Sequence, residues 1–197
     1  MRADAVLVAL LAAGRATRFG GGKLDAICAG KPVGQWVLEA VAGVGLSPGV
    51  VVTGPKPPRF MSEAKDWDWL INPRPADGLG SSVATAARMA RQRGYEALLL
   101  VLADMPLVTS DMLKRLVAQT GPAASDHGEG RPGVPALFPA PLFERVAACS
   151  GDRGAAVLMK DLPDLAMLPA DDGALIDVDT QKDLERAEAL LLRRSPC

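Results

Sequence analysis

Hydrophobic and polar residues alternate along the chain in blocks that predict strands and helices in turn. Runs of consecutive apolar residues, typical of strands buried on both faces, cover Ala5–Leu11, Val50–Val52 and Ala97–Leu102. Between the first two runs, apolar residues recur at helical spacing from Pro32 to Val44. This alternation predicts an α/β protein, a Rossmann-like three-layer sandwich in which helices cover both faces of a mostly parallel sheet.

Polar residues predict where further helices begin. Ser81 and Ser82 are expected to cap a helix that ends near Gln92, and Thr109 a helix that ends near Ala118. The remaining expected elements are the strands Trp67–Ile71, Val134–Phe138 and Leu175–Val178 and the helices Pro141–Cys149, Gly154–Lys160 and Gln181–Leu192.

Stretches rich in proline, glycine and polar residues predict loops. Lys56–Phe60 is expected to be a loop, and Thr120–Pro135 a mobile surface segment. The strand that follows this segment is expected at the edge of the sheet, because Pro135 has no N–H to donate to a neighbour. The lone histidine, His127, lies in the same segment and is interpreted as a solvated loop residue, not a metal ligand.

Length, charge and cysteine content narrow the class of protein. The 197 residues are expected to form a single domain, residues 1–197. The net charge of −1 gives no reason to expect nucleic acid or an anionic membrane as a partner. No apolar run approaches the ~18 residues of a membrane-spanning helix, and the N-terminus lacks the profile of a secretory signal. Cys28, Cys149 and Cys197 are widely spaced and form no C-x-x-C pair, so reduced thiols and a cytoplasmic location are expected.

The loop after the first predicted strand carries the most informative chemistry. Residues 11–23 read L-A-A-G-R-A-T-R-F-G-G-G-K, with four glycines and the cations Arg15, Arg18 and Lys23. Glycines let a backbone approach phosphates closely, and the cations supply opposite charge. A glycine-rich turn with solvated cations would have the same composition. The glycine spacing fits neither a P-loop nor G-x-G-x-x-G.

Acidic residues follow two other predicted strands, where ligands bind in open parallel sheets. Asp104 comes directly after the central strand and is suited either to hold Mg²⁺ or to cap a turn. Asp177 and Asp179 alternate, so on an extended chain both point to one face and could share a metal or its water shell. Asp179 or Thr180 is also suited to cap the last helix.

The pattern L-A-A-G-x-x-x-R-x-G-x-x-K resembles the signature loop of nucleotidyltransferases of the nucleotide-diphospho-sugar transferase (GT-A-like) type. It is most similar to the branch that attaches nucleotides to molybdopterin, although Phe19 replaces the usual Met. The resemblance implies that the loop wraps the triphosphate of a nucleotide and that Lys23 contacts phosphate. Ala13 resembles the CTP-using members, since GTP users usually carry Gly there. The implied nucleotide-binding residues are Leu11, Ala12, Ala13, Gly14, Arg15, Gly20, Gly22, Asn72, Gly78, Ser81 and Ser82.

Motifs for metal and acceptor follow in the family's order. Asp104-Met105-Pro106 resembles the family's D-x-P, whose aspartate binds Mg²⁺, and residues 177–184, D-V-D-T-Q-K-D-L, resemble D-I-D-T-P-E-D-L. The implied metal ligands are therefore Asp104, Asp177 and Asp179. On the acceptor side the match is incomplete, because Val134 stands in the position of the family's histidine and Ala156 in that of its arginine. The implied acceptor residues are Gly133, Gly151, Asp152 and Arg153.

The resemblance implies an Mg²⁺-dependent transfer of CMP from CTP, or GMP from GTP, to the phosphate of molybdopterin, with release of pyrophosphate. Lys23, Arg18 and Asp104 would be the catalytic residues, and no general base is needed because the attacking phosphate is already an anion. A transient contact with a molybdoenzyme or its chaperone is also implied.

Three alternative functions remain to be weighed against this reading. A sugar-1-phosphate or polyol-phosphate nucleotidyltransferase would share the same nucleotide-binding half. A non-catalytic cofactor-binding chaperone with this fold is disfavoured by the retained lysine and carboxylates. A Rossmann oxidoreductase is disfavoured because Thr53-Gly54-Pro55, and no acidic residue, ends the second strand.

Overall fold

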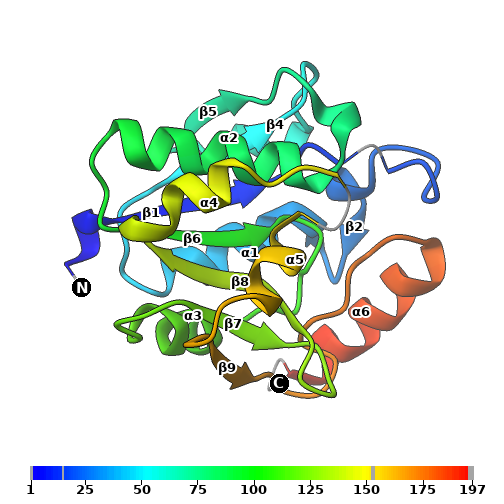
Figure 1. Ribbon diagram of the computed structural model, residues 1–197. Coiled ribbons are helices and arrows are strands. Elements are labelled where there is room, and N and C mark those ends of the chain that lie inside the picture. The colour runs from blue at the N-terminus through cyan, green and yellow to red at the C-terminus, as the bar shows by residue number, and fades with distance from the viewer. Residues whose placement is uncertain (1, 15, 152–153, 195–197) are drawn as a thin grey trace.

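The computed structural model describes residues 2–14, 16–151 and 154–194 (Figure 1). A seven-stranded sheet with the order β5-β4-β1-β6-β8-β7-β9 forms the centre of the fold. Its strands are β1 (Val6–Leu11), β4 (Val50–Thr53), β5 (Asp68–Ile71), β6 (Ala97–Leu102), β7 (Ala123–Asp126), β8 (Pro132–Pro139) and β9 (Ala166–Pro169). Strand β8 is antiparallel to both of its neighbours, and the other pairs are parallel. Six strands therefore end at the same edge of the sheet.

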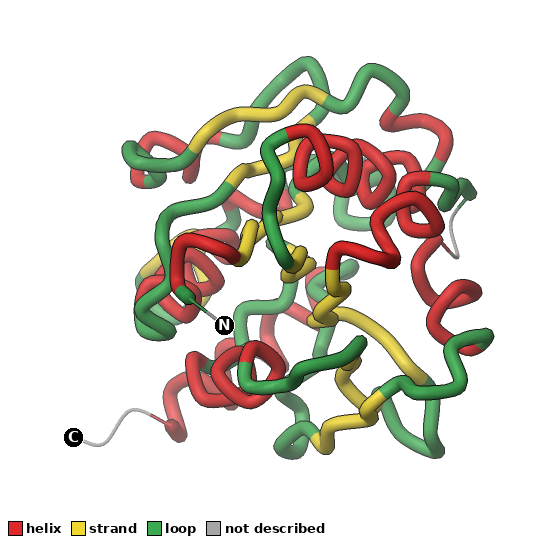
Figure 2. The backbone as a smooth tube through the Cα atoms, turned by 60° about the vertical axis from the view of Figure 1, so that its left-hand side comes forward, coloured by secondary structure: helices red, strands yellow, loops and turns green. Residues whose placement is uncertain are grey.

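Helices cover both faces of this sheet, as the alternating pattern predicts. The α-helices are α1 (Val33–Ala42), α2 (Leu79–Gln92), α3 (Ser110–Val117), α4 (Phe143–Ala147), α5 (Gly154–Lys160) and α6 (Gln181–Arg194). Figure 1 shows α2 and α4 in front of the sheet and α1 behind it, and Figure 2, turned by 60°, shows strands between the two groups of helices. No helix among the described residues is long and apolar enough to cross a membrane.

The side chains of β1 alternate between two hydrophobic cores. Val6, Val8 and Leu10 join the core formed with α1, α3 and α6, whereas Leu7 and Ala9 join the core formed with α2, α4 and α5. A strand flanked by two cores must be apolar at every position, which explains why this run has no polar alternation. The predicted three-layer α/β sandwich is confirmed.

Short elements complete the structure around the sheet. Strands β2 (Ile27–Cys28) and β3 (Lys31–Pro32) form a small antiparallel sheet, which lies next to α6. The 3₁₀ helices are η1 (Ala3–Ala5), η2 (Lys23–Asp25), η3 (Arg59–Glu63), η4 (Pro75–Asp77) and η5 (Ala140–Leu142).

Two strand predictions are wrong: one strand lies elsewhere in the sheet than expected, and the predicted strand Leu175–Val178 does not form. Strand β8 lies inside the sheet and not at its edge, because the pairing with β7 slips between Ala124 and Ser125 and leaves Pro135 in a bulge. There, the Ser125 hydroxyl donates to the Pro135 carbonyl at 2.9 Å. The segment 175–178 forms no strand, and the edge position is taken by β9.

The segment Thr120–Pro135 is not a simple surface loop. Its residues 123–126 form β7, and Ala123, Ala124 and Ser125 are buried. His127 lies in the loop after β7, as predicted, but it is half-buried and its Nε2 lies 2.8 Å from the Val134 carbonyl oxygen, so the ring is only partly solvated.

Two predicted helix starts have different outcomes. The Thr109 hydroxyl accepts a hydrogen bond from the Met112 N–H and caps α3, as predicted. Helix α2 instead begins at Leu79, after Gly78 with a φ of 84°, so Ser81 and Ser82 are buried inside the helix and do not cap it.

Candidate functional site

A cavity of about 660 Å³ opens at the carboxyl ends of β1 and β6, where the sheet topology predicts a ligand site. It is lined by Leu11, Ala13, Gly14, Ala16, Thr17, Arg18, Lys23, Pro75, Ala76, Gly78, Leu79, Ser82, Leu102, Asp104, Asp177 and Asp179. The cavity therefore brings the loop after β1 together with the acidic residues that follow β6 and precede α6.

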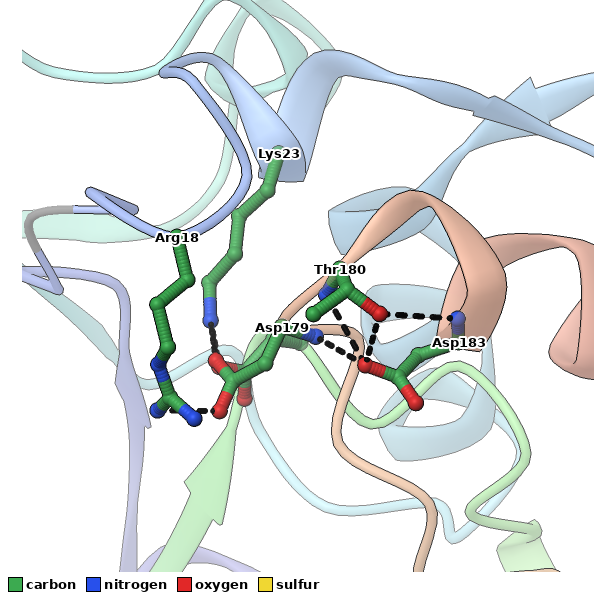
Figure 3. Close-up of polar contacts among 6 residues, drawn as sticks. Arg18, Lys23, Asp179, Thr180 and Asp183 are labelled. Atoms are coloured by element: carbon green, nitrogen blue, oxygen red, sulfur yellow. Dashed lines mark hydrogen bonds and ion pairs between the residues drawn. The ribbon is translucent and has the colours of Figure 1, made fainter.

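An ion-pair cluster joins these segments (Figure 3). Lys23 Nζ lies 2.5 Å from Asp104 Oδ2 and 2.8 Å from Asp179 Oδ1, across 81 and 156 residues of sequence. Arg18 Nη2 lies 2.6 Å from the other Asp179 oxygen. Lys23 is only 6% exposed, and a buried ammonium of this kind is tolerated because two carboxylates compensate the loss of water.

Glycines shape the loop that returns Lys23 to the cavity. Gly20, Gly21 and Gly22 have φ values of 90°, 100° and 62°, a left-handed backbone that L side chains rarely adopt. Gly22 directly precedes η2, whose first residue is Lys23. Neither Gly20 nor Gly22 lines the cavity described above, so the geometry supports a role in loop conformation for both. Arg15 lies outside the described residues.

Asp104 has the properties of a metal ligand. Its Oδ1 atom is buried and has no hydrogen-bond partner among the residues that the structure describes. A buried acceptor without a partner costs free energy, and an oxygen-seeking divalent cation would satisfy it. The residue is held in place by its own backbone, since its carbonyl accepts a hydrogen bond from the Val178 N–H at 2.9 Å.

The remaining carboxylates do not form a ready-made metal cage. Within the described ranges, no three His, Cys, Asp or Glu side chains are grouped so as to hold a cation. Lys23 lies between Asp104 and Asp179 and neutralises both. Asp177 and Asp179 both face the cavity, as their alternation predicts, and of the two, Asp179 pairs with the described cations Arg18 and Lys23.

The pKa values of two side chains at the cavity, Asp177 and Lys23, are raised for different physical reasons. Asp177 is exposed to the open cavity, but partial loss of water around its carboxyl group, together with the negative charges of Asp104 and Asp179, raises its pKa to about 7. Burial alone would lower the pKa of Lys23, but the two paired carboxylates outweigh it and hold the pKa above its usual value. Lys23 is therefore a fixed cation at neutral pH.

The segment after β5 is organised by a buried asparagine. Asn72 is 1% exposed, and its amide donates to the Ser81 and Ser82 hydroxyls at 2.7 and 3.0 Å. The Ser81 hydroxyl lies 2.8 Å from both the Gly78 and Arg74 carbonyl oxygens, which share its single proton. Of the residues implied for nucleotide binding here, Gly78 and Ser82 line the cavity, whereas Asn72 and Ser81 hold η4 and the start of α2 beside it.

A second, mainly apolar cavity of about 460 Å³ continues from the first. It is lined by Ala12, Ala13, Gly14, Gly54, Pro55, Lys56, Pro75 and Ala76, of which Ala13, Gly14, Pro75 and Ala76 also line the first cavity. Sequence reasoning missed the contribution of residues 54–56, whereas Pro75 and Ala76 lie in the segment between Asn72 and Gly78, two residues that the resemblance implies for nucleotide binding. The available signal was the Gly54-Pro55 pair at the end of the second predicted strand.

Gly133 and Gly151, the two implied acceptor residues that the structure describes, do not line the main cavity. A Cβ on Gly133 would lie 2.4 Å from the His127 ring, so this glycine permits the histidine to pack on β8. The Gly151 carbonyl accepts a hydrogen bond from the Gly80 N–H at 2.9 Å. Asp152 and Arg153 lie outside the described residues.

Comparisons with known proteins identify the family of the chain. The family model described as the MobA-like NTP transferase domain matches residues 8–166. The chain is similar to the purine catabolism protein PucB of Bacillus subtilis (strain 168), at 29% identity over 200 residues that cover 94% of this chain and 97% of PucB.

Solved structures share the fold at lower identity. A nucleotidyl transferase from Methanothermobacter thermautotroptrophicus superposes with a TM-score of 0.82 at 21% identity, covering 96% of this chain and 99% of that one. Rv0371c of Mycobacterium tuberculosis H37Rv, in complex with manganese, gives 0.72 at 21% identity over 93% and 98% of the two chains. Molybdopterin-guanine dinucleotide biosynthesis protein A from Archaeoglobus fulgidus gives 0.65 at 21% identity over 94% and 98%.

The family match covers most of the sheet, all residues that line the second cavity, and the residues of the first cavity from Leu11 to Asp104, but not Asp177 and Asp179. The chain therefore belongs to the MobA-like NTP transferase domain family and is a nucleotidyltransferase with a GT-A-like α/β fold.

Proposed function

We propose that the protein transfers CMP from CTP to the terminal phosphate of molybdopterin, in an Mg²⁺-dependent reaction that releases pyrophosphate. One observation carries the nucleotide half of the proposal: Lys23 and Arg18 meet Asp104 and Asp179 in a single cavity. Charges of both signs at one site are what a metal-bound triphosphate requires. The motifs that resemble the molybdopterin branch support the acceptor.

In the transfer, an oxygen of the acceptor phosphate attacks the α-phosphorus of the nucleotide. The bond between this phosphorus and the α–β bridging oxygen breaks, and pyrophosphate leaves with the electron pair. A bound Mg²⁺ would neutralise phosphate charge, and Asp104, through Oδ1, with Asp179 would hold it. Lys23 and Arg18 neutralise the charge that develops on the pyrophosphate, and the N-terminus of α2 adds its dipole.

No general base takes part in this mechanism. The attacking phosphate is already ionised, so it needs no proton removed. The adjoining apolar cavity is suited to a nucleobase, and we infer that Ala13, which lines it, favours cytosine. Residues 1–197 act as one domain, and free thiols at Cys28 and Cys149 are in keeping with a cytoplasmic location.

The test is a set of parallel incubations of the purified protein with Mg²⁺. CTP and GTP are each combined with molybdopterin-bearing cofactor or with a sugar 1-phosphate, and pyrophosphate release and product mass are measured. A cytosine dinucleotide of the pterin, formed with CTP only, is the expected product. Pyrophosphate release with the sugar phosphate and not with the pterin would contradict the acceptor, and tight pterin binding without any pyrophosphate would contradict catalysis.

A further inference from the structure

Asp179 lies on a segment that the sheet does not hold. Residues 175–179 form no strand, yet Asp179 meets Lys23 and Arg18 with both of its carboxylate oxygens. On its N-terminal side, the chain is anchored by the hydrogen bond from the Val178 N–H to the Asp104 carbonyl. Something must also fix its C-terminal side, because an unpaired backbone would let the carboxylate move away from the cations.

A reciprocal hydrogen-bond unit at the start of α6 supplies this second anchor (Figure 3). Asp183 Oδ2 accepts hydrogen bonds from the Thr180 N–H at 2.8 Å, the Thr180 hydroxyl at 2.7 Å and the Asp179 N–H at 3.3 Å. The Thr180 hydroxyl accepts one from the Asp183 N–H at 3.2 Å. This is the arrangement of a capping box, with the backbone of the functional residue added to it.

The hydrogen-bond unit of Thr180 and Asp183 includes a charged carboxylate, and the hydrophobic packing of α6 does not depend on it. Hydrogen bonds from Thr180 hold the pKa of Asp183 below its usual value, so the side chain is an anion at neutral pH. Helix α6 is attached to the core by its own buried residues Leu184, Ala187 and Leu191. Loss of the Asp183 side chain should therefore loosen the junction at Asp179 while leaving α6 packed.

We propose that Asp183, acting through Thr180, is a positioning residue that sets the backbone of Asp179 so that its carboxylate stands beside Asp104. This inference rests on the proposed function, because it takes Asp104 and Asp179 as the two residues that hold the metal. The Val178–Asp104 hydrogen bond and the Thr180–Asp183 unit then fix the spacing of the two carboxylates from opposite ends of one short segment.

The test is a titration of the whole, nucleotide-free protein with Mn²⁺. Electron paramagnetic resonance measures the concentration of unbound Mn²⁺ at each step. Asp183→Ala and Thr180→Val remove the unit, whereas Thr180→Ser keeps the hydroxyl. Thr109→Val is the matched control, because it removes a cap of the same kind from α3, whose Thr109–Met112 hydrogen bond does not touch the cavity. Melting temperatures of all variants are recorded in parallel.

Asp183→Ala and Thr180→Val should weaken Mn²⁺ binding about 10-fold, as is common for groups that orient a metal ligand. Thr180→Ser should bind like the wild type, and Thr109→Val should lower the melting temperature without changing Mn²⁺ affinity. In turnover assays, the Mg²⁺ concentration for half-maximal rate should rise by a larger factor in Asp183→Ala than kcat falls.

Asp179→Asn separates failure of this inference from failure of the proposed function. Equal Mn²⁺ affinity in Asp183→Ala and Thr109→Val, with weakened binding in Asp179→Asn, would overturn the positioning role alone. Wild-type Mn²⁺ affinity in Asp179→Asn would overturn the metal assignment on which it rests.

Discussion

The two halves of the sheet are built in different ways. The half formed by β5, β4, β1 and β6 is entirely parallel, and the loops at its carboxyl edge line both cavities. In the half formed by β8, β7 and β9, one strand is reversed and one pairing contains a bulge. Of the implied acceptor residues, Gly133 packs against the His127 ring in this half, whereas Gly151 is exposed, and neither lines the main cavity.

The parallel half therefore carries the charged residues of the candidate site, whereas the mixed half mainly stabilises the fold. In the parallel half, consecutive strand ends deliver side chains to one point, so Lys23, Arg18 and Asp104 converge without special local geometry beyond the glycine loop. In the mixed half, His127, Gly133 and Ser125 use their polar atoms or small size to hold the strands together. Substitutions in the first half should therefore change catalysis, and substitutions in the second should first change stability.

The largest effect is expected for Lys23→Ala. Turnover should fall about 100-fold or more, because loss of one preorganised group that meets transition-state charge commonly costs ~3 kcal/mol. Pyrophosphate release at saturating CTP and acceptor measures it. Lys31→Ala is the control, since Lys31 pairs with Glu39 and does not line the main cavity. Near-wild-type turnover in Lys23→Ala would remove the catalytic role of the loop.

Gly133→Ala tests the mixed half. Its Cβ would lie 2.4 Å from the His127 ring, so the ring or β8 must shift, at a cost of about 1–3 kcal/mol. Chemical denaturation should show this loss, and CTP affinity measured by calorimetry should stay unchanged. The double variant with His127→Ala should recover much of the stability. A Gly133→Ala protein with normal stability but weaker CTP binding would contradict the proposed division between the halves.

Asp177→Asn should alter how stability depends on pH. The folded-state pKa of Asp177, about 7, lies above that of an unfolded chain, so the native state retains a proton as the pH rises. The resulting stabilisation is fully present below about pH 4 and is lost as the pH rises to 7. Without metal, the variant should therefore melt above the wild type at pH 8 but not at pH 4. The gain should be a few degrees at most, since the group is open to the cavity. An equal difference in melting temperature between variant and wild type at pH 4 and pH 8 would contradict the raised pKa of Asp177.

The smallest effect is expected for Glu144→Gln. Glu144 pairs with Arg91 between α4 and α2, but both side chains are more than half exposed, and such pairs contribute about 0–1 kcal/mol. Denaturation curves should nearly overlap those of the wild type, and turnover should be unchanged. A clear loss of activity here would mean that the packing of α4 on α2 influences the cavity, which nothing in its lining predicts.

Local sequence patterns predicted much of the nucleotide side. The apolar runs of β1, β4 and β6 report burial on both faces, so these strands, and the loops that follow them, could be located before any contact was known. The Thr109 cap of α3 was also predictable, because a cap depends only on residues three positions apart in the sequence. The Ala-Ala-Ser-Asp strand β7 was not, because small residues carry no strong strand signal.

The sequence by itself predicted three parts of the site, because each follows from a short local pattern. These are the cations of the loop after β1, the carboxylate after β6 and the two aspartates before α6. Only the folded chain decides that β8 lies inside the sheet, that residues 175–178 stand free of it, and that Asn72 turns inward to Ser81 and Ser82. It also decides that Lys23 bridges Asp104 and Asp179. These outcomes depend on strand pairing and on contacts between residues far apart in sequence, which neither spacing nor composition records.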